Sequence, residues 1–140
     1  MLNELDALVN VDFTTREVNA LHTKLKICRI GTSGAIRKDV PIDAFLLSKY
    51  ALGMDGLLRF YEAEDCRLPS LEKIAPVDAY GVSAHSGLHD ALSSSDTFSG
   101  ITVTAAGFYG PQNRHVRLKP TLDIVSCFKD KVYDLSLIHI

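Results

Sequence analysis

The feature that most constrains how this 140-residue chain can fold is the stretch Lys26–Ala35, which reads Lys-Ile-Cys-Arg-Ile-Gly-Thr-Ser-Gly-Ala. Apolar Ile27, Cys28 and Ile30 predict a short buried strand, and two glycines and two hydroxyl residues follow it directly. Glycine lets backbone N–H groups approach a ligand closely, and the hydroxyl groups and Arg29 add donors that suit a phosphate. Ligands of open α/β sheets bind at such strand ends, so the stretch predicts an anion-binding loop.

Taken alone, this stretch is equally compatible with a strand that runs into a tight turn without a ligand. A Walker A loop is excluded, because no lysine follows the second glycine. A functional interpretation therefore needs a second stretch of the chain.

Composition limits the classes of protein that are possible. The length suits one domain with a core, and 46% hydrophobic and 23% charged residues are ordinary for a soluble globular protein. A net charge of −2 without a basic block argues against broad nucleic-acid binding. No apolar run approaches the ~20 residues that cross a bilayer, and the N-terminus does not read as a signal peptide. Three widely spaced cysteines predict free thiols and a cytoplasmic protein.

Hydrophobic periodicity predicts an alternation of helices and strands. Either Ser83 or Ser86 is expected to cap the helix that follows them. The expected elements are a helix over 2–8, a hairpin over 9–20, strands over 25–30, 44–52 and 100–106, an extended or edge segment over 39–43, mostly loop over 62–82, and helices over 86–92 and 121–129.

A second stretch, Gly107–Arg114, reads Gly-Phe-Tyr-Gly-Pro-Gln-Asn-Arg. Together the two stretches resemble the nucleoside phosphorylase family, and within it the uridine phosphorylases. That family carries an Arg-x-Gly-Thr-Ser/Thr-Gly phosphate loop, followed later by a Phe-Tyr segment with Gln and Arg that reads the pyrimidine. The resemblance covers most of residues 1–134.

This resemblance implies a fold and an activity. The fold would be α/β, a partial three-layer α/β/α nucleoside phosphorylase fold with a mixed central sheet. The reaction would be phosphorolysis of uridine to uracil and ribose 1-phosphate, with phosphate as co-substrate and no organic cofactor. The partners would be small molecules, and the full-length protein would be a homo-oligomer, either a dimer or a hexamer. A purine nucleoside phosphorylase, a nucleosidase that uses water, and a non-catalytic fragment are the alternatives.

The first motif would bind phosphate and one side of the nucleoside. The resemblance assigns phosphate to Arg29, Gly31 and Thr32, and the nucleoside to Thr32, Ser33 and Gly34. A guanidinium grips phosphate oxygens through parallel N–H donors, so Arg29 is expected to be catalytic. A surface ion pair is the ordinary alternative for such an arginine.

The second motif would bind the base. The resemblance has Phe108 stack on uracil, Gln112 pair with the pyrimidine edge, and Arg114 act as the second catalytic residue. Arg114 can donate to a ring oxygen, where negative charge grows as the glycosidic bond breaks. A core aromatic and a solvated Gln and Arg are the alternatives.

The chain departs from the family in several places. Asn113 stands where many members carry glycine, which could alter how Gln112 and Arg114 are presented. A Glu-Met-Glu segment that holds the ribose, early phosphate-binding arginines and a histidine from a neighbouring subunit are not found. We therefore expect a fragment that is inactive alone.

The last six residues, Leu135–Ile140, match the conceptual translation of a transposon-end sequencing adapter. We expect them to be a non-native tail, which leaves residues 1–134 as a partial nucleoside phosphorylase domain. A genuine apolar strand is the alternative.

Two histidines at helical spacing, His85 and His89, are the nearest approach to a metal-binding pattern. No third ligand accompanies them, so no metal site is expected.

Overall fold

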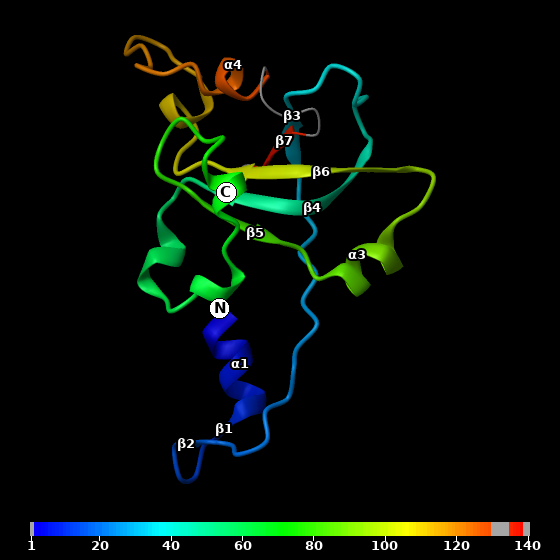
Figure 1. The fold of residues 1–140 in the computed structure, drawn as a ribbon, viewed down its shortest axis with the longest axis vertical. Coiled ribbons are helices and arrows are strands. Elements are labelled where there is room, and N and C mark those ends of the chain that lie inside the picture. The colour runs from blue at the N-terminus through cyan, green and yellow to red at the C-terminus, as the bar shows by residue number, and fades with distance from the viewer. Residues whose placement is uncertain (1, 130–134, 139–140) are drawn as a thin grey trace. The chain divides into compact units, whose positions relative to one another are not determined.

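The computed structural model describes residues 2–129 and 135–138. It divides into two compact units, residues 1–30 and 31–140 (Figure 1). We describe each unit by itself.

The first unit contains a helix and a hairpin, both as predicted. Helix α1 (Leu2–Asn10) leads into strands β1 (Val11–Asp12) and β2 (Glu17–Val18), which pair antiparallel. Asp12 Oδ1 accepts hydrogen bonds from the backbone N–H groups of Thr14 at 2.7 Å and Thr15 at 3.3 Å. These N–H groups hold the pKa of Asp12 below its usual range, and they fix the turn of the hairpin.

The strand predicted over 25–30 is wrong. These residues form no regular element, and Ile27 and Ile30 are 48% and 94% exposed. An extended segment becomes a strand only when a neighbouring strand satisfies its backbone groups, and no described residue pairs with this segment. Its apolar residues were therefore misread as a sign of burial.

The second unit is built on a mixed sheet in the order β3-β7-β6-β4-β5 (Figure 1). The β4–β6 and β6–β7 pairs are parallel, whereas β3–β7 and β4–β5 are antiparallel. The α/β class with a mixed sheet is thereby confirmed, as are the strands predicted over 44–52 and 100–106. The strands are β3 (Ser33–Ala35), β4 (Phe45–Gly53), β5 (Tyr80–Ser83), β6 (Thr97–Thr104) and β7 (Leu135–Ile138).

The core of the second unit lies where the two longest strands meet helix α4 (Ile124–Lys129). Leu52 of β4, Val103 of β6 and Phe128 of α4 are the largest fully buried side chains. Apolar burial of this kind stabilises by roughly 1.5–3 kcal/mol for each large side chain. The helix predicted over 121–129 is confirmed, but it begins later, after Asp123.

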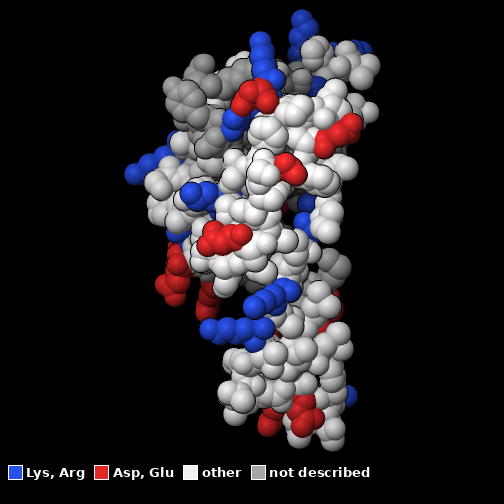
Figure 2. Space-filling model, turned by 90° about the vertical axis from the view of Figure 1, so that its right-hand side faces the viewer, with Lys and Arg blue, Asp and Glu red and all other residues white. Residues whose placement is uncertain are grey.

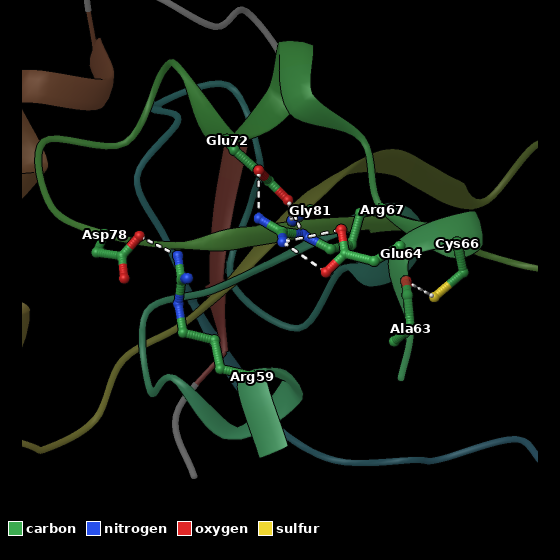
Figure 3. A network of polar contacts seen from close by, with 8 residues as sticks. All are labelled: Arg59, Ala63, Glu64, Cys66, Arg67, Glu72, Asp78 and Gly81. Atoms are coloured by element: carbon green, nitrogen blue, oxygen red, sulfur yellow. Dashed lines mark hydrogen bonds and ion pairs between the residues drawn. The ribbon is translucent and has the colours of Figure 1, made fainter. Parts of the chain in front are cut away.

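The loop predicted over 62–82 is wrong in part, because short elements form there: η2 (Glu64–Cys66), α2 (Pro69–Glu72) and β5. The short helix η1 (Leu57–Phe60) comes just before this range. Arg67 organises this region (Figure 3): its guanidinium donates to both oxygens of Glu72 at 2.8 Å, and Glu72 also accepts from Gly81 N–H at 3.2 Å. Leu68 N–H donates to Gly81 O at 2.7 Å. These contacts span many residues, so local periodicity could not show them.

Two local details correct the expectations. Helix α3 (Ser86–Leu92) has the predicted bounds, but its cap is His85, whose Nδ1 accepts from Leu88 N–H at 3.3 Å. The segment over 39–43 is a turn and not an extended edge, because Asp43 adopts a φ of 66° and Ala44 N–H donates back to Pro41 O.

Gly53, at the end of β4, leaves room for the ring of Tyr80. A Cβ at this position would lie 2.2 Å from Tyr80 Cζ. The Tyr80 hydroxyl donates to Asp55 Oδ1 at 2.7 Å, and burial together with this bond raises the pKa of the phenol. The absence of a side chain at position 53 thus lets a tyrosine close this end of the sheet.

Residues 135–138 form strand β7, which is consistent with their apolar pattern whatever their origin. Whether the tail is native remains a prediction, and residues 139–140 lie outside the described residues. Within the described ranges, no helix has the length and apolar character that a membrane span requires.

Candidate functional site

In this 140-residue chain, the register of the sheet brings the two motifs to the same end of it, through strand β7, whose residues are among those expected to be a non-native tail. Ser33, at the start of β3, pairs with Ile138 of β7, and Ile138 pairs with Thr104, the last residue of β6. The Gly107–Arg114 segment, which we call the 107–114 loop, leaves β6 at this end. Its root on β6 is two inter-strand spacings, about 10 Å, from Ser33, a separation that one nucleoside can bridge.

The first motif lies at the start of a strand, not at the end of one as predicted. Gly31 and Thr32 precede β3, while Ser33 and Gly34 belong to it, and all four are exposed. Arg29 is also exposed and belongs to the first unit. A Cβ on Gly34 would meet nothing within 4 Å, so open space borders the motif.

The 107–114 loop folds on its own backbone. Tyr109 O accepts hydrogen bonds from the N–H groups of Gln112 at 3.0 Å and Arg114 at 2.9 Å, and Asn113 N–H donates to Gly110 O at 3.0 Å. The short helix η3 (Gly110–Gln112) forms within it, with proline in its first turn. This closure brings the ends of the loop together.

The closure places Arg114 on the face of Phe108. The Arg114 Cζ atom lies 4.3 Å from the centroid of the Phe108 ring, which meets Tyr109 edge to face at 5.3 Å. Phe108 is 43% exposed, so it is not a core aromatic. A cation over an exposed ring contributes about 0.5–1 kcal/mol. The structure therefore brings together two of the residues expected to bind the base.

Gln112 completes the group with an unmet donor. Its Nε2 atom is buried and has no hydrogen-bond partner among the described residues. Leaving a buried amide unsatisfied costs about 1–3 kcal/mol, so such atoms call for an explanation.

Asn113, the departure from the family pattern, keeps the backbone that a glycine would provide. Its φ of 58° and ψ of 28° lie in the left-handed region, where asparagine is tolerated better than most residues. Its Nδ2 donates to Asp123 Oδ1 at 2.7 Å. Sequence reasoning missed Asp123, although an aspartate directly before an apolar helical repeat is a recognised capping signal.

A small cavity of about 100 Å³ lies away from both motifs. The arginines that line it are already paired, Arg67 with Glu72 and Arg59 with Asp78 (Figure 3). It is therefore not an open anion site. Its lining residues are Leu58, Arg59, Tyr61, Glu64, Arg67 and Tyr80.

The histidine pair is used within the fold. His85 caps α3, and His89 Nε2 lies 2.9 Å from Ser99 Oγ. In the part of the chain that the structure describes, no three His, Cys, Asp or Glu side chains are grouped to hold a metal ion. On the face drawn in Figure 2, basic and acidic side chains are interspersed among uncharged ones.

Comparison with known proteins places the chain in a family. The phosphorylase superfamily matches residues 8–127, a range that contains both motifs. This chain belongs to the phosphorylase superfamily. No curated protein matches it.

This phosphorylase-superfamily chain is also similar to a solved structure, the nucleoside phosphorylase of Trypanosoma brucei, which shows uridine phosphorylase activity. The TM-score is 0.65 at 20% sequence identity, and the match covers 97% of this chain and 64% of that one. The likeness confirms the nucleoside phosphorylase fold. The chain spans less than two thirds of that relative's length.

Proposed function

We propose that the protein to which this chain belongs is a uridine phosphorylase, a pentosyltransferase that converts uridine and phosphate to uracil and ribose 1-phosphate. Superfamily membership supports a phosphorylase that acts on nucleosides. The choice of a pyrimidine base rests on the 107–114 loop. The trypanosome relative, with uridine phosphorylase activity, is compatible with this choice.

The observation that carries the proposal is the buried, unpartnered Nε2 of Gln112. An amide offers both donors and an acceptor, which complements the alternating carbonyl and N–H groups of a uracil edge. Phe108 supplies an exposed aromatic ring in the same loop, with Arg114 over one face. The loop thus offers hydrogen bonding and stacking in one short segment.

On the phosphate side, Arg29 and Thr32 orient the nucleophile. A phosphate oxygen attacks the anomeric carbon with inversion, the bond from that carbon to uracil N1 breaks, and its electron pair leaves with the base. Arg114 donates to a carbonyl oxygen of the departing uracil anion. To do so it leaves the face of Phe108, which then becomes available to the base.

The test uses the full-length protein, obtained by reading the genomic DNA on both sides of this frame. Uracil release from uridine that requires phosphate and yields ribose 1-phosphate supports the proposal. Release without phosphate would identify a nucleosidase, and a preference for inosine would identify a purine nucleoside phosphorylase.

The 140-residue chain provides a second test. If uridine raises its melting temperature without turnover, the chain is a ligand-binding part of the enzyme. If neither uridine nor phosphate has an effect, the alternative of a non-catalytic fragment that does not bind is favoured. The same full-length protein would show by sedimentation whether it is the dimer or hexamer that we propose.

The proposed non-native origin of residues 135–140 has its own test. Resequencing the locus without transposon adapters should give different codons after Asp134. The same six codons followed by a stop would contradict a non-native origin of these residues.

A further inference from the structure

We infer that Asp123 is a positioning residue for the 107–114 loop, acting through Asn113 on Gln112 and Arg114. This inference rests on the proposed function, because it assigns a task to the proposed base site. It starts from one shared carboxylate oxygen: Asp123 Oδ1 accepts from Asn113 Nδ2 at 2.7 Å and from the backbone N–H of Ser126 at 3.1 Å. The loop and helix α4 therefore meet at a single side chain.

The helix side of this link is anchored in the core. Asp123 Oδ2 accepts from Ser126 Oγ at 2.7 Å, and Asp123 O accepts from Cys127 N–H at 3.0 Å, so Asp123 is the N-cap of α4. Ile124 and Phe128 of the same helix belong to the buried core. The carboxylate is thus held by a helix that is anchored in the core.

On the loop side, the link is made by Asn113, whose backbone conformation sets the path of the loop. Asn113 stands between Gln112 and Arg114, and its left-handed φ of 58° determines where the chain turns between them. Asparagine adopts this region more readily than most residues but less readily than glycine, so the bond to Asp123 stabilises a conformation that the backbone alone does not favour. Loosening Asn113 would move both neighbouring side chains.

Four substitutions separate this link from general stability. Asn113→Gly keeps the left-handed backbone but removes the amide, and Asp123→Ser keeps a helix cap but is too short to reach Asn113. Ser126→Ala is the matched control, because it removes a contact to Asp123 and leaves the link. Asp123→Asn retains an acceptor oxygen and is the conservative rescue.

The first measurement is amide hydrogen exchange of the 140-residue chain. The Gln112 and Arg114 N–H groups, which both donate to Tyr109 O, should exchange roughly five- to tenfold faster in Asn113→Gly and Asp123→Ser. They should keep the parent rate in Ser126→Ala and regain it in Asp123→Asn.

The second measurement compares dissociation constants for uracil and for inorganic phosphate. The two link variants should weaken uracil binding roughly five- to tenfold and leave phosphate binding within about twofold, a split that a general loss of stability would not produce.

Unchanged exchange in Asn113→Gly, or equal acceleration in Ser126→Ala, would overturn the inference. If Asp123→Ser unfolds, Asn113→Gly decides alone. If the parent chain does not bind uracil, the proposed function loses its support in this chain, while the exchange rates still decide whether Asp123 positions the loop.

Discussion

The two motif segments share one end of a sheet but are held in different ways. The 107–114 loop is closed by hydrogen bonds to Tyr109 O and Gly110 O and attached to the core through Asn113 and Asp123. The Gly31–Gly34 segment is exposed, and the backbone pairing recorded for it comes from β3 against β7. A preorganised loop loses little entropy when its ligand binds, whereas an exposed segment is ordered by the ligand itself. We therefore expect the base site to be formed before the base binds, and the phosphate site to become ordered only when phosphate binds.

The largest effect expected from this difference is a separation of binding from turnover in the 140-residue chain. Uracil should bind, but uridine and phosphate together should give no uracil above the buffer control, because catalysis needs both ligands in one fixed geometry. A coupled assay for ribose 1-phosphate measures this. Turnover well above the control would show that the exposed segment is sufficient as it stands.

Next in size is Arg29→Ala in the full-length protein. Losing a charge-assisted contact to phosphate costs roughly 1.5–3 kcal/mol, which at ~1.4 kcal/mol per decade is about a 10- to 150-fold loss in kcat/KM. The loss should show when phosphate is the varied substrate. Lys26→Ala, at a nearby exposed cation, is the matched control. An Arg29→Ala enzyme with unchanged phosphate dependence would remove Arg29 from the site.

Arg114→Ala should have a smaller effect, because Arg114 has to give up its contact with the Phe108 ring before it can bind the base. Its contact to the base, about 1.5–3 kcal/mol, is offset by about 0.5–1 kcal/mol of cation–π attraction to Phe108. The net loss of about 0.5–2.5 kcal/mol corresponds to roughly 2- to 70-fold in kcat/KM. Part of it should appear in kcat, since charge on the base grows mainly in the transition state.

Steady-state kinetics with uridine varied, and with Arg117→Ala as control, test this second substitution. A loss seen only through phosphate would reverse the assignment of the two arginines.

How far the sequence predicted these regions depends on the range of the interactions. Phe108 and Arg114 are near neighbours in the chain, so a contact between them needs no distant partner. The strand over 25–30 failed because pairing needs a distant partner. Strand β5, at the end of the segment 62–82, was missed for the same reason, since its partner β4 is distant in the chain.

Within the candidate site, the sequence did not show the role of Asp123. Its position before a helix is a local signal, but its bond to Asn113 joins residues that no local pattern connects. The His85 cap escaped prediction because imidazole is not among the usual capping groups.

The smallest expected effect is on stability, at an ion pair outside both motifs. Glu72→Gln should lower the stability of the second unit by about 1 kcal/mol at neutral pH, because the guanidinium of Arg67 loses its charged partner. Glu64→Gln is the control, since its ion pair with Arg67 is longer, at 3.4 Å, and Glu64 is 83% exposed. Neither substitution should accelerate amide hydrogen exchange of the Arg114 N–H by more than the loss of global stability accounts for.

The pH dependence of this effect has a definite sign. The hydrogen bond from Arg67 holds the pKa of Glu72 below its ordinary value of 4.5. A lowered folded-state pKa contributes stability that is present above the unfolded value and is lost as pH falls through the folded value. Urea unfolding at a series of pH values should show the parent and Glu72→Gln converging below pH 4.5. A constant difference would mean that the pair contributes by packing and not by charge.

The contact of Gly53 with Tyr80 has an evolutionary consequence. Since a methyl group at position 53 would lie where the tyrosine ring now lies, alanine there is harmful while Tyr80 remains and can become harmless once residue 80 is small. The order residue 80 before residue 53 is therefore the favoured one, since the reverse order forces the tyrosine ring to move and break its bond to Asp55. Two adjacent strands of this sheet thus constrain which single-step paths through sequence space are open to the protein.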